Sequence, residues 1–173
     1  MRKIRRIFRY QLPMHFVLLL TNWFPDNVFF LKIRGYFISP FFKRCGANLR
    51  VGRNNTFYDS HLIELGKNIY ISEGIWFNGS GGIIVGDEVI FGPKSLIVTS
   101  NHTKHAGSFR YGKPIIKRIK ISKGSWIGGN SSILSGVNIG EGSLIAANSV
   151  VNKDVDKDSL YAGNPAKFIK KIN

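Results

Sequence analysis

The stretch ISKGSWIGGNSSILSGVNIGEGSLIAANSVV, residues 121–151, decides the fold of this 173-residue chain. An aliphatic β-branched residue recurs there at every sixth position: Ile121, Ile127, Ile133, Ile139, Ile145 and Val151. A helix face repeats near 3.6 residues and a strand face every two, so a period of six indicates short strands separated by corners. Gly and Asn lie between the aliphatic positions and suit corners, because both tolerate a positive φ. The stretch therefore predicts a solenoid of hexapeptide coils, each buried against its neighbours.

The same period continues upstream with two slips of two residues, which keep inward side chains inward. The inward positions expected there are Val51, Phe57, Ile63, Leu65, Ile71, Phe77, Ile83, Val85, Phe91 and Ile97. The register is lost over residues 99–117, a polar stretch that we expect to loop out of the scaffold, where function tends to lie. We divide the chain into a helical segment at 1–48, a solenoid at 49–155 and a turn with a short helix at 156–173.

The charge of the chain is strongly basic and uneven. The formal net charge is +15, and residues 1–50 hold ten Lys and Arg against a single acid, Asp26. Such a basic pole indicates an anionic partner, which is phospholipid, nucleic acid or a phosphorylated substrate. The single cysteine, Cys45, excludes an intrachain disulfide and fits a reducing compartment.

The first 48 residues predict helices. Residues 14–20 form an apolar run that is too short to span a bilayer. A basic start before an apolar run resembles a signal peptide, but this run is interrupted and no small-residue cleavage site follows, so we expect it to be retained. Residues 26–44 predict an amphipathic helix capped by Asp26 and rich in aromatic residues. Two interpretations of these aromatics stay open: they cap the solenoid, or they lie on an anionic membrane face.

Four motifs resemble those of the hexapeptide-repeat acyltransferases, above all the galactoside and maltose acetyltransferases. They are NHTKH at 101–105, GKPI at 112–115, WIGGNSSILSGVNIGEGSLIAANSVVNKDV at 126–155 and YAGNPAKFIKKI at 161–172. The resemblance implies an all-β fold, a left-handed parallel β-helix, usually a homotrimer that binds acetyl-CoA between subunits, with no metal expected. The segment NWFPDNVFFLKIRGYFISPFFKRCGANLRVGRN, residues 22–54, is similar to that of acyltransferases of capsule, exopolysaccharide or lipopolysaccharide assembly. This similarity implies a cytoplasmic protein, on or near the inner face of the cell membrane, that acetylates a sugar or a lipid-linked saccharide.

By this resemblance the catalytic residue falls on His102, the first His of NHTKH. A neutral imidazole can take the proton of a sugar hydroxyl as that hydroxyl attacks a thioester carbonyl. The resemblance also implies that His105 and Asn78 lie near the acceptor. The chain departs from the galactoside enzymes at their Asn-Phe-Asn acceptor motif, where it reads SEGIWFNGS over residues 72–80.

The cofactor residues implied by the resemblance lie further along the chain. Trp126 would line the acyl or acceptor pocket, and the pantetheine arm would run beside Gly129 and Ala147, where small residues allow close approach. Lys153 and Lys167 would meet the phosphates of the cofactor. Trp126 and the lysines also have purely structural interpretations, as an outward aromatic at a subunit contact and as a solvated tail.

Three other functions were weighed. An N-acetyltransferase acting on an amino sugar stays open, because one imidazole serves either nucleophile. A γ-carbonic-anhydrase-like zinc enzyme would need His61, His102 and His105 as ligands, a spacing that we do not associate with that site. Binding to nucleic acid is disfavoured, because no recognised motif for it occurs and the aromatics of the first 48 residues follow an apolar periodicity.

Overall fold

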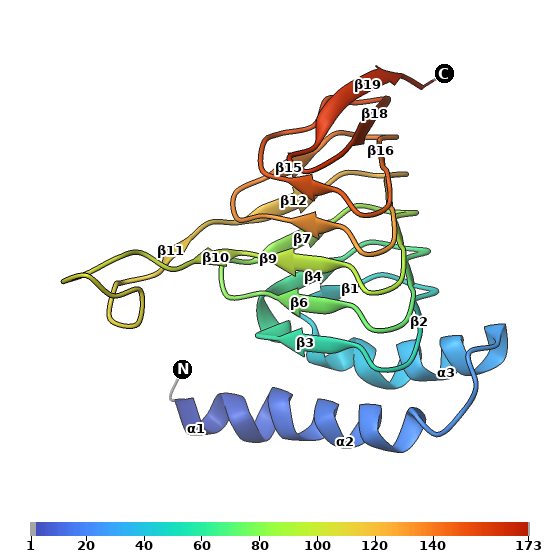
Figure 1. Ribbon diagram of the computed structural model, residues 1–173. Coiled ribbons are helices and arrows are strands. Elements are labelled where there is room, and N and C mark those ends of the chain that lie inside the picture. Colours follow the sequence, from blue (N-terminus) through green and yellow to red (C-terminus); the bar gives the residue numbers. More distant parts are fainter. Residues whose placement is uncertain (1–2, 173) are drawn as a thin grey trace.

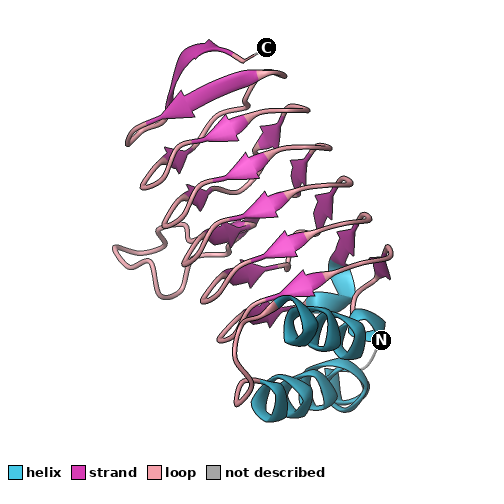
Figure 2. Cartoon of the chain, turned by 90° about the vertical axis from the view of Figure 1, so that its right-hand side faces the viewer, coloured by secondary structure: helices cyan, strands magenta, loops and turns pink. Residues whose placement is uncertain are grey.

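The computed structural model describes residues 3–172, which form a three-sided solenoid with helices across one end (Figure 1, Figure 2). The first sheet contains β1 (Arg44–Cys45), β4 (Ile63–Leu65), β7 (Ile83–Val85), β12 (Ile119–Ile121) and β15 (Asn138–Ile139). The second contains β2 (Arg50–Val51), β5 (Tyr70–Ile71), β8 (Ile90–Phe91), β13 (Trp126–Ile127), β16 (Leu144–Ile145), β18 (Ser159–Ala162) and β19 (Lys167–Lys171). The third contains β3 (Thr56–Tyr58), β6 (Trp76–Asn78), β9 (Leu96–Val98), β14 (Ser132–Ile133) and β17 (Val150–Val151).

The core consists of inward side chains stacked along each side of the solenoid. Every inward position expected from the six-residue period is buried. In the first sheet Ile121 pairs in parallel with Val85 on one side and Ile139 on the other. In the first coils three aromatic rings pack in a row: Phe77 stacks on Phe57 with centroids 5.1 Å apart and meets Phe91 edge-to-face at 5.2 Å. The period therefore predicted the core correctly.

A second buried position lies two residues before the inward residue of a strand, and the sequence analysis missed it. Its members are aliphatic early in the chain and mostly serine later: Ile69, Ile75, Val89, Ser95, Ser125, Ser131, Val137, Ser143 and Ser149. The buried hydroxyl of Ser125 donates to the carbonyls of Ser122 and Gly140, both at 2.9 Å. Buried polar groups need such partners, so these serines tie each corner to the next coil.

Two different constraints operate at the corners. Asn130 and Asn148 have φ values of 59° and 60°, and the amide of Asn130 donates to that of Asn148 at 2.6 Å. The φ of Gly128 is not positive, but a Cβ there would lie 2.5 Å from the backbone nitrogen of Ala147. Asn therefore supplies a left-handed turn, while Gly128 leaves space for the adjacent coil.

The N-terminal residues form two helical segments. The first runs through α1 (Lys3–Arg6), the π-helix η1 (Ile7–Gln11) and α2 (Leu12–Thr21), and the second through α3 (Val28–Ile38) and the 3₁₀ helix η2 (Ser39–Phe41). The predicted cap at Asp26 is wrong, because Asn27 caps α3 by accepting a hydrogen bond from the nitrogen of Phe30 at 3.1 Å. Among the described residues, none of the helices combines the length and apolar content that a membrane span requires.

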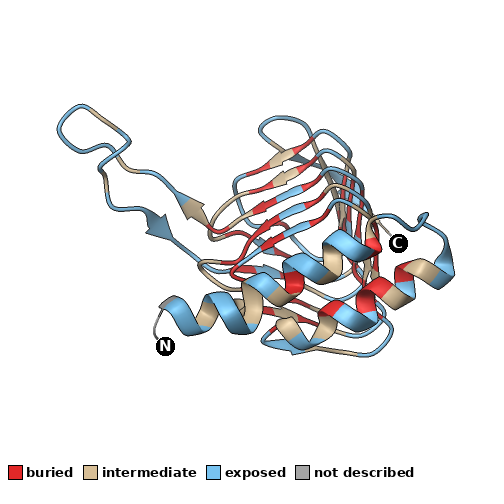
Figure 3. Ribbon diagram, turned by 90° about the horizontal axis from the view of Figure 1, so that it is seen from below, coloured by how far each residue is buried: buried red, intermediate tan, exposed pale blue. Residues whose placement is uncertain are grey.

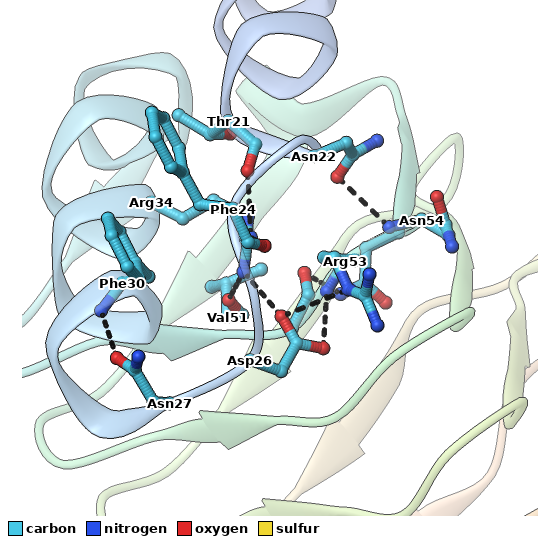
Figure 4. Close-up of polar contacts among 12 residues, drawn as sticks. Thr21, Asn22, Phe24, Asp26, Asn27, Phe30, Arg34, Val51, Arg53 and Asn54 are labelled. Carbon is cyan, nitrogen blue, oxygen red and sulfur yellow. Dashed lines mark hydrogen bonds and ion pairs between the residues drawn. The ribbon is translucent and has the colours of Figure 1, made fainter.

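Asp26 is instead engaged by Arg34, which joins the helices to the first coil (Figure 4). The Arg34 side chain is completely buried, and its Nη1 lies 3.0 Å from Asp26 Oδ1 and 2.6 Å from the carbonyl oxygen of Val51. Its Nη2 donates to the carbonyl of Thr21 at 2.9 Å. Burial lowers the pKa of the Arg34 guanidinium, and the Asp26 carboxylate opposes that shift. One cation thus holds the end of α2, the connecting loop and β2 together.

The short helix predicted in residues 156–173 is wrong. The chain instead forms an antiparallel hairpin, in which β18 joins the second sheet in parallel with β16 and then pairs with β19. Phe168 packs edge-on against Tyr161, with centroids 5.8 Å apart. The last coil would otherwise expose a row of unpaired backbone groups, and β19 covers that edge. Pairing at the edge of the sheet therefore decides the conformation of these residues.

Candidate active site

Most of the residues singled out from the sequence lie at two corners of the solenoid. We call the turn from the third sheet to the first the loop corner, because residues 99–117 leave the solenoid there (Figure 1). We call the turn from the second sheet to the third the glycine corner, because it contains Gly129. The projecting residues begin and end in a short antiparallel pair, β10 (Ser100–Asn101) with β11 (Ile115–Ile116). Thr103 Oγ1 donates to the carbonyl of Lys113 at 2.6 Å and so closes the hairpin further out.

His102 directly follows β10, and its side chain is exposed. His105 is also exposed, and its backbone exchanges two 2.9 Å hydrogen bonds with Ser108, which fold the tip of the loop into a tight turn. Neither imidazole takes part in a hydrogen bond recorded for residues 3–172. An exposed imidazole on an organised hairpin is free to meet a substrate from outside its own chain.

Asn78 lies at the end of β6 and is buried at the base of this hairpin. Its Nδ2 donates to Ser100 Oγ at 2.9 Å, and its Oδ1 accepts from the nitrogen of Ser80 at 3.1 Å. Thr99 Oγ1 donates to the carbonyl of Asn78 at 2.7 Å. The structure thus joins Asn78 to Ser100, which lies two residues before His102, so the amide of Asn78 is already engaged by the loop base.

A buried carboxylate adjoins this base and was missed in the sequence. Asp59 has a left-handed φ of 54°, and its Oδ2 accepts from Ser80 Oγ at 3.1 Å. Its Oδ1 lies 3.4 Å from Arg6 Nη1 and 4.0 Å from His61 Nδ1. Burial lowers the pKa of His61, and Asp59 opposes that shift. The sequence does contain polar residues such as Asp59 and Ser80 at the loop corner of successive coils. Their contact joins residues 21 positions apart, so no short sequence motif contains both partners.

The glycine corner holds two of the predicted cofactor residues. Gly129 and Ala147 lie in adjacent coils, joined by a 3.0 Å hydrogen bond from the Asn148 nitrogen to the Gly129 carbonyl. Gly129 is half-buried, and a Cβ there would come within 3.2 Å of Pro93. Ala147 is exposed, so little side chain stands above the backbone along this corner. That shallow backbone surface fits a thin, extended ligand arm.

The remaining cofactor residues lie elsewhere. Trp126 is on β13 of the second sheet, points outward and is 50% exposed. Lys153 is exposed on the loop corner of the last coil, and Lys167 is exposed at the start of β19. One chain therefore does not bring Gly129 and Ala147 together with His102, because the third sheet separates the glycine corner from the loop corner.

The three histidines weighed as zinc ligands are not assembled. His61 lies in the 3₁₀ helix η3 (Ser60–Leu62) beside Asp59, whereas His102 and His105 are on the projecting hairpin. In the described part of this single chain, no group of three or more His, Cys, Asp or Glu side chains is placed to hold a metal ion.

Comparison with known proteins gives the same fold. Residues 118–153 match the family model described as bacterial transferase hexapeptide (six repeats). The galactoside O-acetyltransferase of Lactococcus lactis is 33% identical over 114 residues, which are 62% of this chain and 55% of that protein. The structure of a maltose O-acetyltransferase from Clostridium difficile has a TM-score of 0.83 and 27% identity, covering 97% of this chain and 88% of that one.

A second solved structure bears on the ligand. A hexapeptide-repeat acetyltransferase from Vibrio cholerae, in complex with acetyl coenzyme A, has a TM-score of 0.81 and 29% identity, covering 93% of this chain and 86% of that one. The chain spans 55 to 61% of the length of curated relatives that it matches. The predicted left-handed parallel β-helix and the resemblance to hexapeptide-repeat acetyltransferases are confirmed.

Proposed function

Because the chain carries the hexapeptide repeat and the fold of the solved hexapeptide-repeat acetyltransferases, we propose that it transfers an acetyl group from acetyl-CoA to a sugar hydroxyl. The observation that carries this proposal is the polar hairpin that interrupts an otherwise continuous repeat and presents an exposed His102. A rigid scaffold with one functional loop is a common arrangement for an active site.

The chemistry assigned to His102 is that of a general base. Its neutral imidazole accepts the proton of the acceptor hydroxyl while the hydroxyl oxygen forms a bond to the thioester carbonyl carbon. A backbone N–H stabilises the resulting oxyanion. When the C–S bond breaks, the protonated imidazole returns its proton to the departing thiolate, so the products are the acetyl ester and free CoA. Asn78 would act as a positioning residue, since its amide holds the loop base through Ser100.

We propose that the acting form is a homotrimer in which the loop corner of one copy faces the glycine corner of the next. The support is that one chain separates His102 from Gly129 and Ala147 by the width of the third sheet. Trp126, which is half-exposed and lies outside the loop corner, would then line the acyl pocket. Lys153 and Lys167 would lie near the phosphates of the cofactor. His105 and the cluster around Asp59 would contact the acceptor, where paired polar groups discriminate between hydroxyls.

Mixed oligomers test the shared site. His102→Ala removes the base, and Ala147→Trp fills the shallow corner, so each variant alone should be inactive. Co-refolding the two in equal amounts should restore about a quarter of the wild-type activity, if copies mix randomly around a closed ring. Mixtures that stay inactive while oligomers of mixed composition form would refute the shared site.

The pathway and location are also part of the proposal. We infer that the acceptor is a saccharide intermediate of polysaccharide assembly, lipid-linked or free, met in the cytoplasm at the inner face of the cell membrane. The support is the basic, aromatic N-terminal segment. A panel of sugars, amino sugars, nucleotide sugars and lipid-linked oligosaccharides, read by thiol release from acetyl-CoA, tests the acceptor class. Turnover with an amino sugar only would move the assignment to N-acetylation.

A further inference from the structure

The first helical segment has two apolar faces, and only one of them has a partner. Met14 and Thr21 are buried against the first coil and α3, with Val17 and Leu18 packed beside them. A second apolar row follows the other side of the same helix at steps of three or four residues and continues to Trp23 in the turn after α2. We call this row the outer stripe: Ile4, Phe8, Leu12, Phe16, Leu19, Leu20 and Trp23. Within α2, at about 100° per residue, the outer-stripe residues Leu12, Phe16, Leu19 and Leu20 centre roughly opposite the packed row.

The outer stripe is unusually exposed for side chains of its type. Phe8 is 67% exposed, Phe16 56%, Leu20 67% and Trp23 85%. Seen along the solenoid from its N-terminal end, the helix lies across the outside of the first coil, with exposed residues along much of its length (Figure 3). Single exposed apolar residues are ordinary, but a continuous row of large ones marks a contact surface.

The charge beside the outer stripe is of one sign. Arg5 and Arg9 are exposed on the same helix, and the guanidinium carbon of Arg9 lies 5.5 Å from the ring centre of Tyr10. Arg6 does not contribute, because its guanidinium faces inward to Asp59 at 3.4 Å. The sequence contains no acidic residue before Asp26. A surface that is both apolar and basic is complementary to a partner that is apolar and anionic.

We propose that the outer stripe lies in the surface of an anionic lipid bilayer, with Arg5 and Arg9 at the headgroups and the solenoid standing away from the lipid. Amphipathic helices of this kind bind through buried apolar area together with attraction to anionic lipids. A terminal Trp suits the boundary, because its ring has an apolar body and a polar N–H. A second copy fits the same face less well, since two like-charged faces repel when they meet.

Sedimentation with vesicles tests this proposal on the full chain. The chain should sediment with vesicles of phosphatidylcholine and phosphatidylglycerol (about 3:1) far more than with pure phosphatidylcholine, and salt should weaken the binding. Phe8→Ser with Phe16→Ser and Trp23→Ser should weaken binding by at least about tenfold, because the buried apolar area is lost. Arg5→Gln with Arg9→Gln should weaken it about thirtyfold, at about 1 kcal/mol per basic residue.

Matched controls keep the test specific. Ile169→Ser removes an apolar residue that is 54% exposed at the opposite end of the solenoid, and Lys94→Gln with Lys120→Gln removes two exposed cations from its sides. Both controls should bind vesicles like the wild type. The arginine variant leaves every apolar contact in place, so its result does not depend on whether the serine variant folds.

Three outcomes would overturn the proposal. They are equal binding to neutral and anionic vesicles, unchanged binding of the arginine variant, and loss of oligomer mass in the serine variant. The last would mean that the outer stripe is a contact between copies. No readout here requires acetyl transfer, so failure of this proposal leaves the proposed activity untouched.

Discussion

Asn78 Nδ2 donates a 2.9 Å hydrogen bond to Ser100 Oγ, and this bond ties the third sheet to the base of the hairpin that carries His102. Asn78 comes from the coil before the hairpin, 22 residues earlier in the chain. The position of the proposed base therefore depends on contact between two coils as well as on the hairpin's own sequence.

Substitution at either end of this bond should misplace the loop. Asn78→Ala leaves Ser100 and the nitrogen of Ser80 without their partner, at a cost of about 1–2 kcal/mol. We expect kcat to fall about tenfold while the KM for acetyl-CoA stays near its wild-type value. Steady-state kinetics of Asn78→Ala, Ser100→Ala and the double variant provide the measurement. Additive effects of the two single changes would contradict the coupling, because residues that share one hydrogen bond should not add.

Arg34→Met should strongly destabilise the chain. The guanidinium is completely buried and donates to Asp26 and to the carbonyls of Val51 and Thr21, and all three would lose this donor while staying close to one another. Removal of one member of such a network costs about 3 kcal/mol. Urea unfolding followed by circular dichroism measures the change. Lys32→Met, on the exposed side of α3, is the control and should change stability by less than about 0.5 kcal/mol. Equal effects of the two substitutions would argue against the role of Arg34.

Gly128→Ala should destabilise the solenoid without any strain in φ. The added Cβ would meet the Ala147 nitrogen at 2.5 Å, and a backbone atom of the next coil cannot move aside cheaply. Overpacking of this kind costs about 1–3 kcal/mol. Asn152→Ala is the matched control, because Asn152 follows Val151 as Gly128 follows Ile127, yet it is exposed on the last coil. A thermal midpoint that drops equally in both variants would contradict this account.

The stability of the chain should depend on pH through His61. Burial lowers the pKa of folded His61 below its ordinary value near 6.5, so the unfolded chain binds more protons between the two values. This contribution is complete above about pH 6.5 and is lost as the pH falls toward the folded pKa. Urea midpoints of the wild type should therefore decline between about pH 7.5 and 5.5 more steeply than those of His61→Gln. His15→Gln, at an exposed position on α2, should follow the wild type, and parallel curves for all three would refute the prediction.

Much of the fold could be predicted from the sequence because the solenoid repeats one local rule. A side chain that faces inward at Ile121 faces inward again at Ile127, so the period alone finds the strands. The serines of the second buried position, such as Ser125, were not predicted to be buried, because a hydroxyl is polar and the sequence alone does not show its partners. Their hydrogen bonds to neighbouring carbonyls become visible only when the coils are stacked.

The ends of the chain and the candidate site were harder to predict. The local position of Asp26 predicts a helix cap, but its carboxylate instead accepts hydrogen bonds from the Arg34 side chain and the Arg53 backbone nitrogen. The loop that carries His102 could be predicted because the six-residue period stops over residues 99–117. The contact of Asp59 with Ser80 spans 21 residues, and no local spacing reveals a contact of that length.

The most direct measurement of the central claim is thiol release from acetyl-CoA by His102→Ala, with the best acceptor found for the wild type. The account predicts that kcat falls by about 10²–10⁴, the usual worth of a general base, while acetyl-CoA still binds. His15→Ala, which removes an exposed histidine outside the loop, should retain wild-type turnover. Full turnover by His102→Ala would contradict the account, because the proton of the acceptor would then be taken by another group.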